Sequence, residues 1–358
     1  MSKLNAGPRP FHKRAGFLAC ALLCLAFGEA SVAAEPPPKP LEPPPLQGPL
    51  PIRPTHGEPA APEKFANPEM LVSTADLAQW MAKEKPANTP KFVVIDTRPR
   101  DEFTASRIPG AFNIESDFFQ EPEKKPSYMA TPETVAKAAV LASIEPDTRV
   151  ILYDSHGGRL AARVWFTLWA YGHDHVSILD GGFPKWRDEA RAAENGAAPA
   201  GGKEREGLWK PADKLRGLAL YDDLARFRLK PPAPGTIPPT LMLDARSYAE
   251  YTGTDARAKL PGHFPGAVNM AWEAPLRKVN AKTKGIDDYL VWRQPPEIHT
   301  ILRAAGLAPG QVLLIYDQSG GRSAHLMFSL LLLGYDKSLN YYGGWREYGN
   351  RDDVDVEK

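Results

Sequence analysis

The chain has 358 residues, 43% of them hydrophobic and 24% charged, which is enough to build two ordinary domains with cores of their own. This composition excludes collagen-like, coiled-coil and wholly disordered chains. The 44 basic and 43 acidic residues give a formal charge of +1, so no basic excess exists to neutralise a phosphate backbone, and no nucleic acid is expected as a partner.

The N-terminal residues have the pattern of an export signal. Four basic residues up to Arg14 precede an apolar run from Ala15 to Phe27, and small residues follow through Ala34. The apolar run is too short to span a bilayer, so we expect a signal peptide over residues 1–34, cleaved after about Ala34. The protein would then be exported and periplasmic, with no membrane attachment after cleavage. An uncleaved anchor and lipidation at Cys20 are the alternatives.

The cysteines and prolines are concentrated near the N-terminus. The chain's two cysteines, Cys20 and Cys24, both lie in the expected signal peptide. Cleavage would therefore leave no disulfide, thiolate metal site or cysteine nucleophile. Twelve prolines follow between Pro36 and Pro62, and they predict an extended, proline-rich linker over residues 35–65. A ligand for a proline-recognition domain is the alternative for this segment.

Beyond the linker, helix and strand signals alternate along the chain. In chain order the patterns predict a helix from Ser73 or Thr74 through Met81, a strand over 92–96, a helix over 131–142, a strand over 149–153, a helix over 161–169 and a strand over 176–179. Short apolar strands that alternate with helices predict an α/β fold, with a mostly parallel sheet and helices on both of its faces.

The same series of motifs then occurs a second time. The matching pairs are Asp96-Thr-Arg98 with Asp244-Ala-Arg246, Ile108-Pro-Gly-Ala111 with Phe264-Pro-Gly-Ala267, Asp154-Ser-His-Gly-Gly-Arg159 with Asp317-Gln-Ser-Gly-Gly-Arg322, and Gly181-Gly182 with Gly343-Gly344. A repeat of about 150 residues is too long for a solenoid unit. We therefore predict two homologous domains, over residues 66–200 and 218–358, joined by a linker over 201–217. In the first motif, Arg98 and Arg246 are expected to pair with Glu102 and Glu250.

One pair of motifs forms candidate ligand loops, because each follows an apolar strand and precedes a helix. The second-domain loop contains Asp317, Gln318, Ser319, Gly320, Gly321, Arg322 and Ser323, and the first-domain loop contains Asp154, Ser155, His156, Gly157, Gly158 and Arg159. Glycines at this place allow a tight turn, so that N–H groups and a helix N-terminus can face one anion. Loops at the carboxyl ends of strands are also where α/β folds bind ligands.

The two loop arginines have two possible roles. Each could bind an anion, or each could pair with the aspartate of its own loop, Asp154 for Arg159 and Asp317 for Arg322, and so rigidify the turn. We favour the structural role for Arg159 and leave both roles open for Arg322.

Together the motifs resemble those of the two-domain rhodanese family, the thiosulfate and 3-mercaptopyruvate sulfurtransferases. The resemblance spans residues 66–358 and also rests on Gly172-His-Asp-His-Val with Leu179-Asp-Gly-Gly182, on Gly262-His-Phe-Pro-Gly-Ala267, and on Gly343-Gly-Trp345 with Gly349-Asn-Arg-Asp-Asp353. It implies two tandem rhodanese-like domains, the first of the non-catalytic type. It further implies that the first residue of the second loop is a cysteine, whose thiolate carries sulfane sulfur as a persulfide. Arg257, in an inserted segment, then corresponds to a basic residue near the sulfur donor.

Asp317 stands where that family has its cysteine. A carboxylate has no sulfur with which to form a persulfide and is already an anion at neutral pH. We expect it to lie in or near the N–H cradle and to repel an incoming thiosulfate. The sequence therefore predicts a pseudoenzyme with a binding or scaffold role, whose partner at the inter-domain cleft is a small sulfur-containing anion or a protein.

Two other functions are considered beside this one. The first is a sulfurtransferase with residual activity, or one in which a partner supplies the missing thiol. The second uses Asp317 as a nucleophile toward phosphate or acyl groups, but no paired acid or Mg²⁺ site in the sequence supports it. The patterns of serine hydrolases, zincins and P-loop proteins are absent as well, so no metal site and no cofactor is expected.

Overall fold

The computed structural model describes residues 61–82, 90–120, 128–197, 200–227 and 239–358. The expected signal peptide and most of the proline-rich linker lie outside these residues. The helices are η1 (Pro68–Met70), α1 (Thr74–Met81), α2 (Arg100–Ala105), η2 (Ser116–Phe119), α3 (Pro132–Leu141), α4 (Arg159–Ala170), α5 (Gly182–Asp188), η3 (Tyr221–Phe227), α6 (Tyr248–Tyr251), α7 (Pro295–Ala304), α8 (Gly321–Leu332) and α9 (Gly344–Tyr348). The strands are β1 (Leu71–Val72), β2 (Phe92–Asp96), β3 (Phe112–Asn113), β4 (Arg149–Tyr153), β5 (Val176–Leu179), β6 (Leu218–Ala219), β7 (Thr240–Asp244), β8 (Val268–Asn269), β9 (Leu276–Val279), β10 (Tyr289–Trp292), β11 (Val312–Tyr316) and β12 (Ser338–Tyr341).

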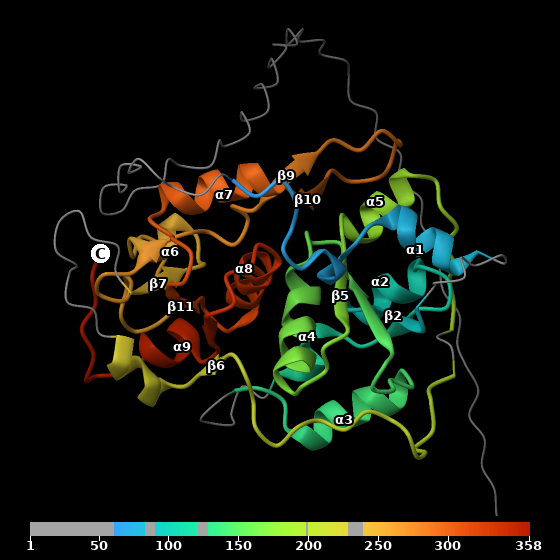
Figure 1. Cartoon of the computed structure of the whole chain (residues 1–358), viewed down its shortest axis with the longest axis horizontal. Coiled ribbons are helices and arrows are strands. Elements are labelled where there is room, and N and C mark those ends of the chain that lie inside the picture. The colour runs from blue at the N-terminus through green and yellow to red at the C-terminus, as the bar shows by residue number, and fades with distance from the viewer. Residues whose placement is uncertain (1–60, 83–89, 121–127, 198–199, 228–238) are drawn as a thin grey trace, which may run out of the picture. The chain divides into compact units, whose positions relative to one another are not determined.

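In the described residues the strands form two equivalent five-stranded sheets. The first has the order β1-β5-β4-β2-β3 and the second the order β6-β12-β11-β7-β8, and every pairing in both sheets is parallel (Figure 1). Strands that match in the repeat occupy matching places in the two sheets. The α/β fold with two tandem domains that the sequence predicts is therefore confirmed.

The central strands β4 and β11 are apolar almost throughout because helices cover both faces of each sheet. Their sequences are Arg-Val-Ile-Leu-Tyr and Val-Leu-Leu-Ile-Tyr, and the last four residues of each are completely buried. Such continuous apolar runs are typical of strands in parallel sheets. Both strands end directly before a candidate ligand loop, which places the two loops at the carboxyl edges of their sheets.

The helices that follow these loops, α4 and α8, pack against each other between the two sheets (Figure 1). Trp165 of α4 meets Phe328 of α8 edge to face, with ring centroids 5.1 Å apart. Both helices belong to one hydrophobic core that runs through the two domains. Because each helix also faces its own sheet, nearly every residue of both is buried. A common core of this kind holds the two ligand loops in a fixed relation.

The predicted helices are found with small differences at their ends. Ser73 caps α1 by accepting a hydrogen bond from the N–H of Asp76 at 3.0 Å, and Thr131 precedes α3. The helix expected over 161–169 begins two residues earlier, at Arg159. It does so because Gly158, with φ of 86°, takes the left-handed conformation that turns the loop directly into the helix.

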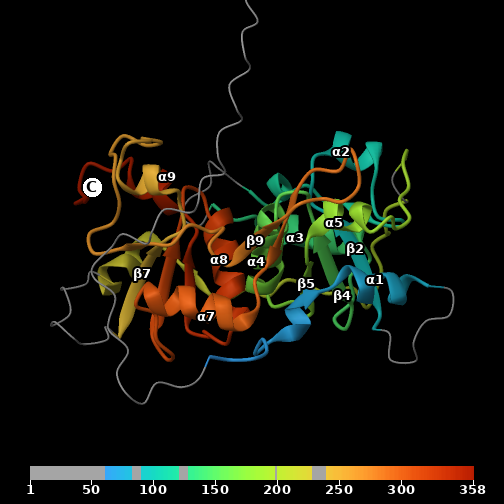
Figure 2. The same ribbon diagram turned by 90° about the horizontal axis from the view of Figure 1, so that it is seen from above.

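The antiparallel hairpin of β9 and β10 corresponds in the first domain to a single antiparallel bridge, between Gln120 and Met129. It leaves the second domain and reaches α5 of the first, as Figure 2 shows from above. There Asp188 accepts hydrogen bonds from the N–H groups of Lys282 and Thr283, both at 2.8 Å. The N–H of Trp292 is likewise bonded to Asp180 at 3.0 Å. The hairpin is therefore hydrogen-bonded to the first domain beside that domain's ligand loop.

Candidate functional site

The second-domain loop is organised around the carboxylate of Asp317, which is 2% exposed. One oxygen, Oδ1, accepts hydrogen bonds from the N–H groups of Ser319 and Gly320 at 3.2 and 2.5 Å, and from Ser323 Oγ at 3.0 Å. The other oxygen, Oδ2, accepts from the N–H of Arg322 at 3.0 Å. The cradle of donors that could hold an anion is thus filled by the chain's own carboxylate.

The first-domain loop is built in the same way around Asp154. Its Oδ1 accepts from the N–H groups of His156 and Gly158 at 2.7 and 2.9 Å. Its Oδ2 accepts from the N–H groups of Leu160 and Ala161 at 2.7 and 3.0 Å. Both domains therefore use an aspartate to satisfy the donors that a tight turn and a helix N-terminus leave open.

Arg322 is bound by Glu250, from α6 of the same domain. Its Nη1 and Nη2 donate to Oε2 and Oε1 at 2.6 and 2.8 Å, and the Glu250 side chain is 1% exposed. Burial alone would raise the pKa of Glu250, but the hydrogen bonds and charge of Arg322 lower it to about 2. Arg322 Nε also lies 3.5 Å from Asp317 Oδ2. Of the two roles left open for Arg322, the structure shows the ion pair, with Glu250 as its main partner.

The pairing predicted for Arg246 is wrong. Its Nε donates to Asp244 Oδ1 at 3.0 Å and its Nη2 to Asp244 Oδ2 at 2.6 Å. Asp244 lies two residues earlier at the buried end of β7, where a carboxylate needs a cation close by. The predicted partner, Glu250, is thereby left for the loop arginine.

The corresponding residues of the first domain are arranged similarly. Arg98 binds Asp96 at 2.6 Å and also forms the predicted ion pair with Glu102, at 3.6 Å. Ser155 of the loop lies 3.5 Å from Arg98 Nη1, and the side chain of His156 is exposed. These loop residues have structural neighbours and no arrangement that suggests a reaction.

Arg163 is a site residue that the sequence analysis missed. It comes from α4 of the first domain and crosses to the second-domain loop, where its Nη1 donates to Ser319 O at 2.9 Å and to Tyr342 Oη at 3.0 Å. A side chain on Gly321 would meet this guanidinium at 2.6 Å, so the glycine is needed for the approach. The available signal was a charge in the interior of a mostly apolar helix.

Arg257 lies at the mouth of the site with 54% of its side chain exposed. Its Nε donates to Asp255 at 3.0 Å and lies 3.7 Å from Glu250. Its carbonyl accepts a hydrogen bond from Gln318 Nε2 at 3.1 Å, which links the inserted segment to the loop. The insertion thus brings Arg257 to the second-domain loop.

The structural role favoured for Arg159 is wrong. The oxygens of Asp154 are taken by N–H groups, and the Arg159 side chain forms no ion pair or hydrogen bond with any residue that the structure describes. It instead lines a cavity that lies between the domains. Arg159 is therefore a cation without a fixed partner in the described part of the chain.

That cavity has a volume of about 380 Å³ and receives side chains from both domains. Its lining consists of Arg159, Leu160 and Arg163 from the first domain, and Arg257, Trp272, Glu273, Asp317, Gln318, Ser319, Gly321 and Arg322 from the second. Four arginines and two carboxylates make it strongly polar. The size lies at the low end of small-molecule sites, which hold about 300–1,000 Å³.

The first-domain loop has no such opening, because the β9–β10 hairpin covers it. A side chain on Gly157 would meet Leu290 at 2.9 Å and Leu276 at 3.3 Å, and one on Gly158 would meet Trp292 at 2.7 Å. From α8, His325 Nε2 lies 3.0 Å from the carbonyl oxygen of Gly157. Apolar side chains therefore occupy the space that a ligand would need.

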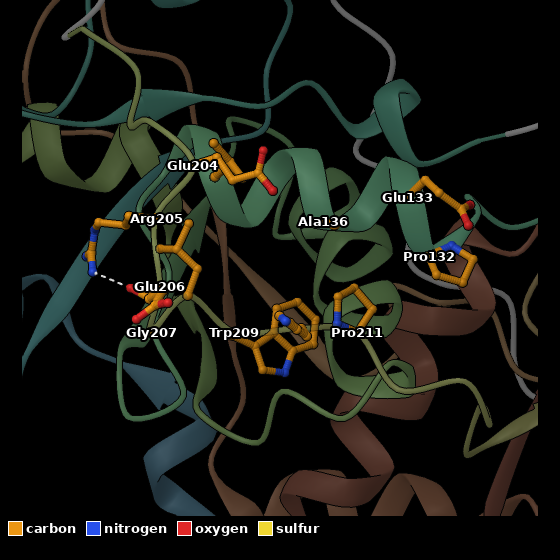
Figure 3. A pocket seen from close by; sticks show the side chains of 12 residues that line it. Pro132, Glu133, Ala136, Glu204, Arg205, Glu206, Gly207, Trp209 and Pro211 are labelled. Atoms are coloured by element: carbon orange, nitrogen blue, oxygen red, sulfur yellow. Dashed lines mark hydrogen bonds between the residues drawn. The ribbon is translucent and has the colours of Figure 1, made fainter.

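A second hollow of about 870 Å³ lies between α3 and the segment around Trp209 (Figure 3). Trp209, Pro132 and Pro211 form part of its surface, and charged side chains surround them. Among these, Arg205 is already paired with Glu145. None of the sequence motifs reaches this hollow, so the inter-domain cavity is the stronger candidate site.

The described residues contain no cluster of three or more His, Cys, Asp or Glu side chains placed to hold a metal ion. No helix in the described part of the chain has the length and apolar character needed to cross a membrane.

The chain matches a known domain family twice. The family model described as "Rhodanese-like domain" matches residues 73–189 and 234–351. Among curated proteins, a thiosulfate sulfurtransferase of Pseudomonas aeruginosa is 26% identical over 296 residues, which cover 82% of this chain and 98% of that protein. A 3-mercaptopyruvate sulfurtransferase of Escherichia coli (strain K12) is 26% identical over 299 residues, 78% of this chain and 96% of that protein.

Solved structures share the fold at lower identity. The crystal structure of YnjE superposes with a TM-score of 0.66 at 23% identity, covering 81% of this chain and 68% of that chain. An anaerobic ergothioneine biosynthesis enzyme from Chlorobium limicola superposes with a TM-score of 0.67 at 22% identity, covering 82% of this chain and 71% of that chain. These similarities concern the fold of the two domains.

Proposed function

Because the chain belongs to the family of rhodanese-like proteins, we propose that it is a tandem rhodanese module that has lost persulfide catalysis and binds a small ligand or a protein partner in its inter-domain cavity. The observation that carries the proposal is the position of Asp317. Its carboxylate accepts four hydrogen bonds from the loop. In a family whose reaction needs a thiolate, this leaves no nucleophile that could take up sulfur.

No other thiol in the chain replaces the missing one. Cys20 and Cys24 are its only cysteines, and both lie far from the two domains in sequence. We infer that residues 1–34 are removed on export to the periplasm, which would leave the protein without cysteine. N-terminal sequencing of the protein from a periplasmic fraction tests this point, and a first residue upstream of Cys24 would contradict it.

The decisive experiment restores the thiol. Wild type and Asp317→Cys are assayed for thiocyanate formed from cyanide with thiosulfate or 3-mercaptopyruvate as donor. We expect wild type at the level of the protein-free blank and turnover by the variant, because the loop donors that now bind a carboxylate can stabilise a thiolate. Turnover by wild type well above the blank would overturn the proposal.

Asp154→Cys is the matched control for this experiment. It introduces the same thiol into the same kind of loop, with four N–H donors around it. Leu276, Leu290 and Trp292 lie against this loop, so we expect no turnover. A gain of activity in Asp317→Cys alone would locate the family's site in the second domain rather than in any loop of this shape.

A second function is favoured by the arginine-lined cavity beside Asp317. A partner's thiolate could attack the sulfane sulfur of thiosulfate bound there, so that an S–S bond forms to the partner and sulfite leaves. Adding a small thiol such as dithiothreitol to wild type and thiosulfate, and measuring sulfite, tests this function. Sulfite release no faster than with dithiothreitol alone would exclude it for that thiol.

A further inference from the structure

The four arginines that line the inter-domain cavity are not equivalent. Arg322 is held by Glu250, Arg163 by Ser319 O and Tyr342 Oη, and Arg257 by Asp255. Their hydrogen bonds fix the loop and the domain contact. These three guanidiniums are therefore already committed within the protein, and a ligand would have to compete with existing partners.

Arg159 is different because it has no partner among the described residues. It is the first residue of α4, and the position of α4 is fixed by the core that both domains share. Its guanidinium keeps all five donors available, which is the arrangement that a carboxylate or other planar anion can use. The free cation of the cavity thus comes from the domain whose own loop is closed.

Glu273 is the corresponding carboxylate; its side chain is exposed at the edge of the cavity and accepts a hydrogen bond from its own backbone N–H. It lies between Trp272 and the β9–β10 hairpin, lines the same cavity, and forms no ion pair with any residue the structure describes. Arg159 and Glu273 form no ion pair with each other, but Arg159 is near enough for its charge to oppose the burial that raises the pKa of Glu273. One cavity therefore offers a separated positive and negative charge.

The base of the cavity adds a second reason to expect a dipolar ligand. Asp317 carries a negative charge there, and the Oε1 atom of Gln318 is buried without a hydrogen-bond donor. An acceptor left in this state needs an N–H or O–H group to meet it. Three of the four arginines are already paired, so a doubly charged anion such as thiosulfate would find one unpaired cation beside two carboxylates, whereas an ammonium group would be attracted by those carboxylates.

We propose that the cavity binds a zwitterionic α-amino acid, with the carboxylate on Arg159 of the first domain and the ammonium group toward Glu273 and Gln318 of the second. The volume of about 380 Å³ suits a ligand of this size. The proposal rests on the proposed function, because it takes the cavity as a binding site without persulfide chemistry. It names the ligand class that the charges of the cavity select.

Four related probes separate the two charges of the ligand. L-cysteine carries both charges, N-acetyl-L-cysteine and 3-mercaptopyruvate carry only the carboxylate, and L-cysteinamide carries only the ammonium group. Isothermal titration of the purified protein, with a phosphine reductant present, measures each affinity. We expect L-cysteine to bind about tenfold more tightly than each of the other three, because each lacks one charge-assisted contact. Equal or tighter binding of 3-mercaptopyruvate, or no binding of L-cysteine, would overturn the proposal.

Two variants assign the contacts. Arg159→Gln should weaken L-cysteine about tenfold and leave L-cysteinamide unchanged, whereas Glu273→Gln should weaken L-cysteine and strengthen 3-mercaptopyruvate. Lys278→Gln, which alters an exposed cation paired with Asp288 outside the cavity, is the matched control. If Glu273→Gln leaves the ratio of the affinities for L-cysteine and 3-mercaptopyruvate unchanged, the proposed orientation of the ligand is wrong.

The outcome does not depend on the cyanide assay. A wild-type protein that turns over thiosulfate would refute the loss of catalysis while leaving the preference among the four probes measurable. Conversely, a silent wild type that shows no preference for L-cysteine would retain the proposed function and refute the ligand class.

Discussion

Arg322 and Glu250 form a buried ion pair with two parallel hydrogen bonds, of 2.6 and 2.8 Å, between the candidate loop and α6. The pair joins the helix that follows the loop to the segment that precedes the inserted residues. Because the arginine also lies 3.5 Å from Asp317, the positive charge is shared by two carboxylates. Within the loop the charges of Asp317 and Arg322 are opposite, and Glu250 adds one further negative charge beside them.

We expect Glu250→Gln to lower the free energy of unfolding by about 3 kcal/mol, because it leaves a mostly buried guanidinium without its main partner. The wild-type pKa of about 2 for Glu250 lies below its ordinary value of 4.5. The pair's contribution is thus complete above about pH 4.5 and is lost as the pH falls toward 2. Denaturant unfolding at pH 7 and at pH 3 measures both effects. Arg257→Gln, at an exposed ion pair, should cost less than about 1 kcal/mol, and an equal loss in both variants would contradict the prediction.

The carboxylate of Asp317 should matter for stability as well as for catalysis. Asp317→Asn replaces one acceptor oxygen by an NH₂ group that faces donors, so we expect a loss of about 2 kcal/mol. Asp352→Asn, at a side chain that is 82% exposed, should change stability by less than about 0.5 kcal/mol. Thermal unfolding of the two variants beside wild type makes the comparison. If Asp317→Asn were as stable as wild type, the negative charge of Asp317 would not contribute to the stability of the loop.

Much of the fold could be predicted because its signals are local. The apolar runs of β4 and β11, the cap at Ser73 and the glycine turns each depend on a few neighbouring residues. The repeat then showed that the pattern occurs twice. The position of Asp317 could be expected for the same reason, since the donors it binds lie within six residues of it.

The residues of the site that come from another domain could not be predicted in this way. Arg163 and Arg159 reach the inter-domain cavity only because α4 and α8 share a core, and no local pattern encodes that contact. The predicted partner of Arg246, Glu250, was wrong because sequence spacing does not show that Asp244 is buried beside the arginine. The covering hairpin was likewise missed, and with it the reason why the first loop is closed.

The closure of the first-domain loop predicts a difference between two glycines. Gly158→Ala would place a methyl group 2.7 Å from Trp292 at a φ of 86°, so we expect a loss of about 3 kcal/mol from strain and from displacement of the hairpin. Gly110→Ala has a similar φ of 73° but meets nothing within 4 Å, and should cost about 1 kcal/mol. Denaturant unfolding compares them. Similar losses of unfolding free energy in the two variants would show that close packing of the hairpin against the loop does not destabilise Gly158→Ala.

His325 links acid stability to the contact between the domains. It is completely buried, with its ring stacked on Trp292 and its Nε2 donating to the carbonyl of Gly157. Burial lowers its pKa to about 4, against an ordinary value of 6.5, so the folded protein holds it neutral where the unfolded chain binds a proton. Stability should therefore be unaffected above about pH 6.5 and should fall by about 3 kcal/mol as the pH drops from 6.5 to 4. His325→Gln keeps a donor for Gly157 but cannot titrate, and its unfolding free energy should vary less over this range than that of wild type. His156→Gln, at an exposed imidazole, is the control, and parallel pH curves for wild type and His325→Gln would refute the assignment.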